Sequence, residues 1–94
     1  MNTKQLLILA AVRHLQPTNT RHAQAFLGKC GGVNIHVYGL DGYDSLLGIY
    51  LTNHGGVANT LQLTEAGRAA IRDIALIREG GTVRVGRIEL VGTS

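Results

Sequence analysis

The chain has 94 residues, of which 45% are hydrophobic and 16% are charged. This composition excludes a disordered chain and predicts a single domain with one modest core, which must be aliphatic because only 4% of residues are aromatic and Trp is absent. The net charge of +3 at pH 7 permits a nucleic-acid partner without requiring one.

The cysteine content and the apolar runs limit the cellular location. The single cysteine, Cys30, excludes an internal disulfide framework. The longest apolar run, Leu6 to Val12, is too short to cross a bilayer and has no cleavage site of the secretory kind. We therefore expect no membrane partner and a cytoplasmic location.

The first predicted element is a helix from about Thr3 to Leu15, which Asn2 or Thr3 can cap. Residues Leu6 to Val12 are apolar on every face, so most sides of this helix must be buried. Two environments meet this requirement equally well, namely a subunit interface and the centre of the chain's own core.

A second helix is predicted from about Thr20 to Lys29. Pro17 ends the first helix, and Thr18, Asn19 and Thr20 offer caps for the next one. The apolar stripe of the second helix comprises Ala23, Phe26, Leu27 and Cys30.

A strand and a third helix are predicted next. Val33 to Tyr38 alternates between apolar and polar residues, as a strand does, and Gly39 to Gly42 is typical of a turn. A third helix is then expected from about Asp41 to Asn53. Its apolar positions are Tyr43, Leu46, Leu47, Tyr50 and Leu51.

The following segment predicts a short strand or tight hairpin and a fourth helix. Val57 to Leu63 contains the hairpin signal Ala58-Asn59-Thr60, and Thr64 caps a helix from about Glu65 to Arg78. The buried face of this helix is predicted to comprise Ala70, Ile71, Ile74 and Ile77.

The C-terminal segment from Thr82 to Val91 is rich in β-forming residues. Val83 and Val85 share one face of an extended strand, whereas Ile88 and Leu90 fall on the other. A bulge at Gly86-Arg87 would restore one apolar face. The basic residues of this segment fit either an exposed sheet edge or pairing with a second copy of the chain.

Two stretches resemble winged-helix proteins. Leu51-Thr52-Asn53-His54-Gly55-Gly56-Val57 has the Leu-x-x-x-Gly-x-Val pattern that ends a helix in that superfamily, and Leu61-Gln62-Leu63-Thr64-Glu65-Ala66-Gly67-Arg68 contains the Leu-Thr-Glu-x-Gly-Arg pattern that closes the wing. In the second pattern, Leu63 is expected to point inward, Thr64 to cap the helix, and Gly67 to allow close approach of helix and strand.

The resemblance implies an α+β fold of the winged helix-turn-helix type. It has four helices, a small β-hairpin wing and a C-terminal β segment. The expected organisation is a single domain over 1–94, with a core over about 3–78 and a β extension over 82–91 that serves dimerisation.

Two features depart from the usual winged-helix pattern. A 12-residue stretch from Cys30 to Asp41 replaces the short turn that normally joins the second and third helices. The exposed face of the third helix also carries Asp41 and Asp44 but no Lys or Arg, which is unfavourable beside phosphates.

The function implied by the resemblance is DNA binding, as a transcriptional regulator of bacterial or phage type that binds double-stranded DNA as a homodimer. The candidate DNA contacts are Arg21, His22, Asn34, His36, Tyr43, Ser45, Asn59 and Thr60. The alternative is a winged-helix module for protein interaction, such as a small phage-encoded inhibitor of a host protein, in which the acidic face of the third helix meets a basic partner.

Catalysis, cofactors and metals are not expected. No nucleophile elbow, phosphate loop or paired acidic clusters occur in the sequence. The soft metal ligands His22, Cys30, His36 and His54 also lack the spacing of a zinc site.

Overall fold

The computed structural model describes residues 3–29, 34–36, 39, 42–72, 76–79, 82–85 and 88–91. They form an α+β arrangement with three α-helices, as expected for the class but one helix fewer than predicted. In chain order the elements are α1 (Thr3–Leu15), β1 (Thr18–Asn19), α2 (Thr20–Lys29), η1 (Tyr43–Ser45), β2 (Leu51–Thr52), η2 (His54–Gly56), β3 (Thr60–Leu63), α3 (Glu65–Ala70), β4 (Leu76–Glu79), β5 (Thr82–Val85) and β6 (Ile88–Val91), where η marks a single 3-10 turn.

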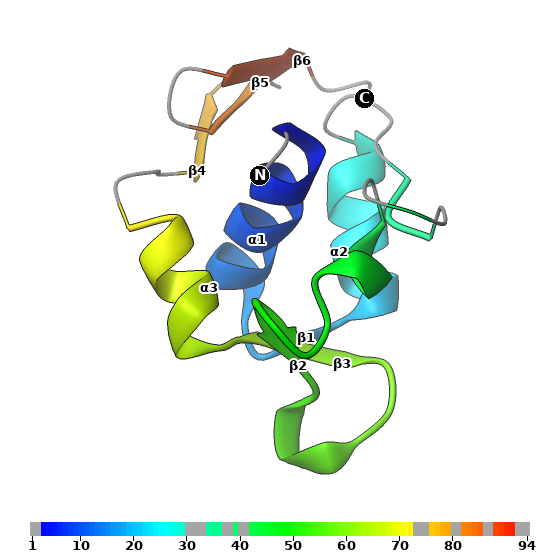
Figure 1. Ribbon diagram of the computed structural model, residues 1–94. Helices are drawn as coiled ribbons and strands as arrows, with labels where there is room; N and C mark the ends of the chain where they lie inside the picture. The colour runs from blue at the N-terminus through cyan, green and yellow to red at the C-terminus, as the bar shows by residue number, and fades with distance from the viewer. Residues whose placement is uncertain are drawn as a thin grey trace.

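Helix α1 has the bounds that the sequence predicts, and it forms the centre of the molecule. Helices α2 and α3 lie on either side of it, the small sheet of β1, β2 and β3 covers its C-terminal end, and β4, β5 and β6 lie near its start (Figure 1). Every residue from Leu7 to Val12 is at most 1% exposed. The chain's own elements therefore bury the helix, as in the second of the two environments considered, and its apolar surface does not require a subunit interface.

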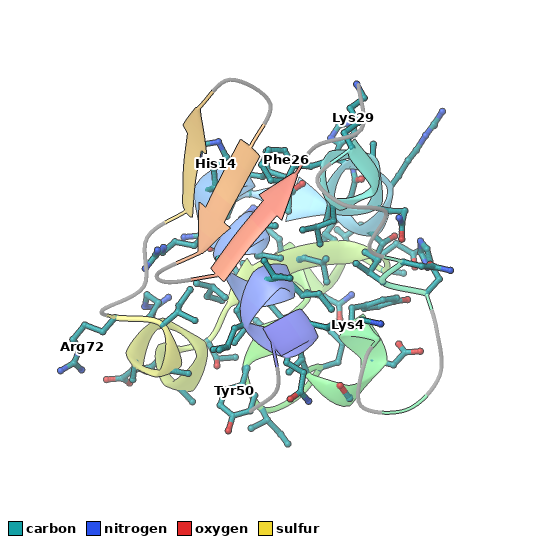
Figure 2. The ribbon with its side chains drawn as sticks, turned by 90° about the horizontal axis from the view of Figure 1, so that it is seen from above. Lys4, His14, Phe26, Lys29, Tyr50 and Arg72 are labelled. Carbon is teal, nitrogen blue, oxygen red and sulfur yellow. The ribbon has the colours of Figure 1, made fainter. Side chains whose placement is uncertain are left out.

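Helix α2 also has the predicted bounds. The side chain of Asn19 caps it, since Oδ1 accepts a hydrogen bond from the His22 N–H at 2.8 Å. Ala23 and Leu27 are fully buried, whereas Phe26 is partly buried. Phe26 packs beside His14 of α1, with 5.6 Å between the ring centroids (Figure 2). The fourth residue of the predicted stripe, Cys30, lies outside the described residues.

The first sheet is antiparallel, with the strand order β1-β3-β2. Thr18 pairs with Leu61 at one edge, and Leu51 pairs with Leu63 at the other. Side chains alternate along β3, so Leu61 and Leu63 are buried while Thr60 and Gln62 are partly exposed. This alternation confirms that Leu63 points inward. The predicted strand over Val57 to Leu63 is limited to its second half.

The predicted third helix is wrong. Within 42–53 only Tyr43–Ser45 is helical, and the chain then turns, because the Leu46 carbonyl accepts hydrogen bonds from the N–H groups of residues 49, 50 and 51. Gly48 has a φ of +86°, which an α-helix does not allow. Leu51 then joins the sheet. Leu46 and Leu51 are nevertheless fully buried, so the apolar positions belong to the core as expected.

The predicted strand over 33–38 is also wrong in its described part, residues 34–36, which forms a turn. The Asn34 side chain accepts a hydrogen bond from the His36 N–H at 3.0 Å, a local bond that competes with strand pairing. Ile35 is fully buried, and the Gln24 side chain accepts a hydrogen bond from its N–H at 2.7 Å. Val33 and Tyr38 lie outside the described residues.

The fourth predicted helix begins correctly but ends early, as α3. The Thr64 hydroxyl accepts a hydrogen bond from the Gly67 N–H at 3.1 Å, which confirms the predicted cap. The helix ends at Ala70, an exposed residue, while Ile71 is fully buried. Residues 76–78, which we expected to be helical, belong to β4 instead, because they pair with β5.

The second sheet is antiparallel and has the order β4-β5-β6. Val85 pairs directly with Ile88 and Val83 with Leu90. Opposed positions of two antiparallel strands share one face, so the apolar residues of β5 and β6 do so here. Gly86 and Arg87, where we predicted a bulge, lie outside the described residues.

Candidate nucleic-acid interface

The start of α2 and the loop between β2 and β3 are joined by a backbone hydrogen bond. The Thr20 N–H donates to the Asn59 carbonyl at 2.8 Å, next to the pairing of Asn19 with Thr60. The fold thereby brings four of the predicted DNA contacts to one end of the molecule (Figure 1). We call them the α2–hairpin group, and they comprise Arg21, His22, Asn59 and Thr60.

The start of α2 carries the positive charge of this group. Arg21 and His22 are both exposed in the first turn. The Thr20 and His22 N–H groups are used by Asn59 and Asn19, so an anion would be favoured by the helix dipole and by the Arg21 guanidinium, which has five donors and a permanent charge. The combination suits a phosphate oxygen.

The loop residues differ in what they offer to a ligand. The Thr60 hydroxyl accepts a hydrogen bond from the His54 N–H at 2.7 Å and donates to the Val57 carbonyl at 2.6 Å. It therefore holds the loop in shape, and a DNA contact would compete with these bonds. Asn59 is exposed and has a φ of +65°, a conformation that asparagine tolerates better than most residues. Within the part of the chain that the structure describes, its side-chain amide has no hydrogen-bond partner.

The other predicted contacts form a second group beside α2, the turn group, anchored by the bond between Gln24 and Ile35. The His36 ring meets the Tyr43 ring edge to face, with centroids 5.6 Å apart, and Ser45 donates to the Gly42 carbonyl at 2.8 Å. The structure therefore divides the predicted site in two. The turn group comprises Asn34, His36, Tyr43 and Ser45.

Charge distinguishes the two groups. Burial raises the pKa of the Tyr43 phenol, and the adjacent Asp44 carboxylate raises it further by its charge and by accepting a hydrogen bond. Asp44 is exposed, so it presents a negative charge beside the turn group. Besides Asp44, Glu65 on α3 is the only carboxylate whose side chain the structure describes. Neither one belongs to the α2–hairpin group.

His54 and Gln62 were not among the predicted contacts, although both lie beside the hairpin loop. The His54 Nδ1 and the Gln62 Oε1 are 3.1 Å apart. The alternation of β3 places Gln62 on the same face as Thr60, and this pattern is visible in the sequence. The pairing with His54 is not, because it depends on how the loop folds.

Within the described residues, no three His, Cys, Asp or Glu side chains lie together as metal ligands. None of the helices in the same residues is long and apolar enough to span a bilayer. No protein-family model matches the chain, and neither the curated proteins nor the solved structures give a match. A function must therefore be inferred from the residues themselves.

Proposed function

We propose that this protein binds double-stranded DNA through the α2–hairpin group, as a winged-helix-like regulator whose wing is the β2–β3 hairpin. The observation that carries the proposal is the bond from the Thr20 N–H to the Asn59 carbonyl. It presents a helix start with Arg21 and His22 next to an exposed loop. Both segments can then contact one duplex, the helix start at the phosphates and the loop beside it.

The charges favour a phosphate partner at this end of the molecule. Arg21 and His22 are exposed, and neither described carboxylate belongs to the same group. The net charge of +3 adds a weak attraction over longer distance. Contacts of this kind fix the protein on the duplex without reading its sequence.

Base reading in this proposal is weak and comes from the turn group. His36 and Tyr43 lie beside α2, but Asp44 next to them repels phosphates and accepts hydrogen bonds only. A carboxylate can accept from cytosine in the major groove, and this is the one base that Asp44 would favour.

The test is binding to a mixed-sequence duplex, followed by fluorescence anisotropy at low and at moderate salt. We expect the logarithm of the affinity to fall linearly with the logarithm of the salt concentration, with a slope of about three or more. Absence of binding at low salt would refute the proposal, because a DNA-binding protein retains non-specific affinity under those conditions.

The second candidate function is protein binding, and one observation favours it. Ile49 is 57% exposed and Val57 is 59% exposed, so each presents apolar surface that a protein partner could cover. Asp44 is also exposed and presents a negative charge. If the protein binds another protein and not DNA, we expect no salt-dependent affinity for DNA.

The proposed regulator acts as a homodimer joined through the segment over 82–91. Both β4 and β6 are edge strands of their sheet, and an edge strand can pair with a second copy. Sedimentation equilibrium of the full chain, compared with a chain shortened to residue 81, measures this directly. Monomeric behaviour of the full chain would refute the dimer.

A further inference from the structure

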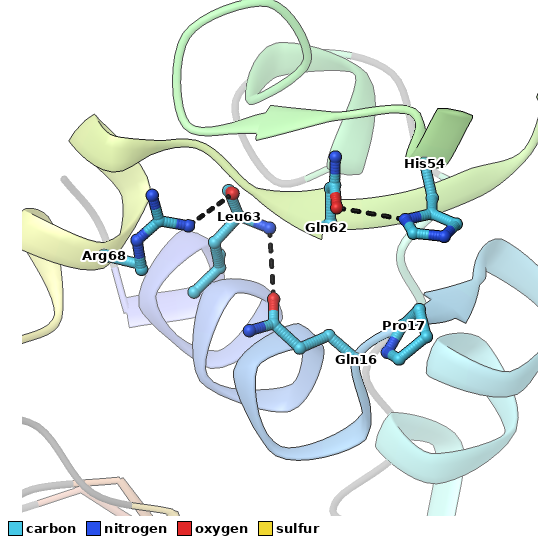
Figure 3. A pocket seen from close by; sticks show the side chains of 6 residues that line it. All are labelled: Gln16, Pro17, His54, Gln62, Leu63 and Arg68. Atoms are coloured by element: carbon cyan, nitrogen blue, oxygen red, sulfur yellow. Dashed lines mark hydrogen bonds between the residues drawn. The ribbon is translucent and has the colours of Figure 1, made fainter. Parts of the chain in front are cut away.

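A pocket of about 270 Å³ opens beside the hairpin, at the junction of the α1 end, β3 and α3 (Figure 3). Arg68 and His54 stand at its two ends, and residues of β3 lie between them. The proposed DNA contacts do not include any of its lining residues. The lining comprises Gln16, Pro17, His54, Gln62, Leu63 and Arg68.

Both amide side chains of the pocket have their oxygen atoms occupied. The Gln16 Oε1 accepts a hydrogen bond from the Leu63 N–H at 3.3 Å, which fixes the orientation of this amide because a backbone N–H can only donate. The Gln62 Oε1 lies 3.1 Å from the His54 Nδ1, and it accepts a hydrogen bond there in the tautomer that carries its proton on Nδ1. In the part of the chain that the structure describes, the two amide nitrogens have no hydrogen-bond partner.

Arg68 supplies the positive charge of the pocket. One guanidinium nitrogen, Nη1, donates to the Leu63 carbonyl at 3.1 Å, so the side chain is held against β3. The guanidinium has further N–H donors that this bond does not use. The lining contains no Asp or Glu, so no carboxylate of the lining neutralises Arg68.

We propose that this pocket binds a small oxyanion, either phosphate or a compact phosphate monoester. The pocket offers one arginine, which is fixed by one of its own donors, and two amide groups with free N–H donors. These donors match the oxygens of such a group, whereas they offer little to a cation. The volume lies just below the usual range of about 300–1,000 Å³ for small-molecule sites, which suits a short ester. Pro17 and Leu63 provide apolar surface for its carbon atoms.

The proposal is tested with glycerol phosphate as the probe, by recording amide NMR spectra of the full chain during a titration. We expect saturable shifts of the Gln16 and Gln62 side-chain amides and of the Leu63 N–H. Glycerol, and sodium chloride at equal ionic strength, should not reproduce them. Shifts that chloride reproduces in full would overturn the proposal.

Two variants, one on α3 and one just beyond it, separate the effect of the pocket from the effect of the overall charge of the protein. Arg68→Gln removes the cation that lines the pocket and should weaken binding at least tenfold, whereas Arg72→Gln removes an exposed cation outside it and should leave binding unchanged. Equal binding by both variants would overturn the proposal. If Arg68→Gln does not fold, Gln62→Glu places a negative charge in the lining and should abolish binding.

The phosphate has two sources, a free ester or the backbone of a bound duplex, and a parallel titration with duplex DNA separates them. Shifts with glycerol phosphate identify a free ester, even if the protein does not bind DNA. Pocket shifts with the duplex alone would overturn the proposal, because a backbone phosphate is a diester and the ligand would then be the nucleic acid. No shift in either titration would overturn the proposal, whatever the DNA affinity.

Discussion

Gly67 of α3 lies so close to the backbone carbonyl of Tyr50 that a Cβ atom at this position would overlap the oxygen. The same carbonyl accepts a hydrogen bond from the Thr64 N–H at 3.0 Å, so it is held in place. The contact fixes α3 against the segment that leads into β2. The sequence predicts close approach at this glycine, and the structure identifies the atom that it approaches.

Gly67→Ala is therefore expected to destabilise the fold. In a free helix this change stabilises by up to about 1 kcal/mol, but overlap with a fixed backbone atom costs about 1 to 3 kcal/mol. Urea denaturation followed by circular dichroism measures the difference. Gly28→Ala on α2 is the matched control, because its Cβ would meet only the end of the Gln24 side chain at 3.6 Å. Equal stability of the two variants would contradict this account.

Thr64→Ala should lower the free energy of unfolding by about 0.5 to 2 kcal/mol, the usual effect of losing a helix cap. The hydroxyl accepts from the Gly67 N–H and also donates to the Ile49 carbonyl at 2.7 Å. Thr64→Ser keeps both bonds and serves as the control in the same urea titration. If serine and alanine have the same effect, the hydroxyl does not act as a cap.

Arg13 joins α1 to the end of α3. Its Nη1 donates to the Ile71 carbonyl at 2.7 Å in a partly buried position. Arg13→Ala should cost about 1.5 to 3 kcal/mol, because a hydrogen bond from a charged donor is lost. Thermal unfolding is the measurement. Arg72→Ala, at an exposed position, should change stability by no more than about 0.5 kcal/mol.

Arg21→Ala tests the proposed DNA contact. Loss of one phosphate contact should lower the affinity for every duplex and reduce the salt slope by about one. Lys29→Ala removes an equal charge at the far end of the same helix, where Lys29 is exposed (Figure 2). The control should leave the slope unchanged. Identical slopes for the two variants would remove Arg21 from the interface.

Tyr43 should make the fold sensitive to alkali. Burial and Asp44 raise the pKa of Tyr43 above its ordinary value of 10.0, so the folded chain holds the phenol proton more tightly than the unfolded chain. This stabilisation is complete below pH 10 and is lost as the pH rises through the folded pKa. Tyr43→Phe should reduce the loss, as measured by urea midpoints across this range. Equal losses of stability in the unchanged protein and in Tyr43→Phe would contradict this explanation.

Local signals in the sequence predicted the helices and caps that depend on neighbouring residues. The apolar run of α1, the Asn19 cap and the Thr64 cap all act within one or two turns of chain. The third helix and the end of the fourth were mispredicted because pairing with another strand decides those segments. Leu51 pairs with Leu63 in a strand, and residues 76–79 pair with 82–85, although both segments have helical spacing of apolar residues.

The candidate site was predicted as one set of residues, but in the structure these residues form two separate groups. Arg21 and Asn59 come together because Thr18 and Asn19 pair with β3, which no local pattern near Arg21 reveals. Within the turn group, Asn34 and His36 were assigned to a strand, and Tyr43 and Ser45 to an α-helix, neither of which forms there. The side chains of the turn group share a location for another reason, namely the backbone hydrogen bond from the Tyr43 N–H to the Ile35 carbonyl at 2.9 Å.

The bond between Thr20 and Asn59 has a consequence for the thermodynamics of binding. The helix start and the loop are already in register in the free chain, so the α2–hairpin group is preorganised. A ligand that contacts both segments does not have to order the loop backbone, and little conformational entropy is lost there on association. Loosening this one bond should therefore weaken binding, even though neither backbone atom touches the ligand.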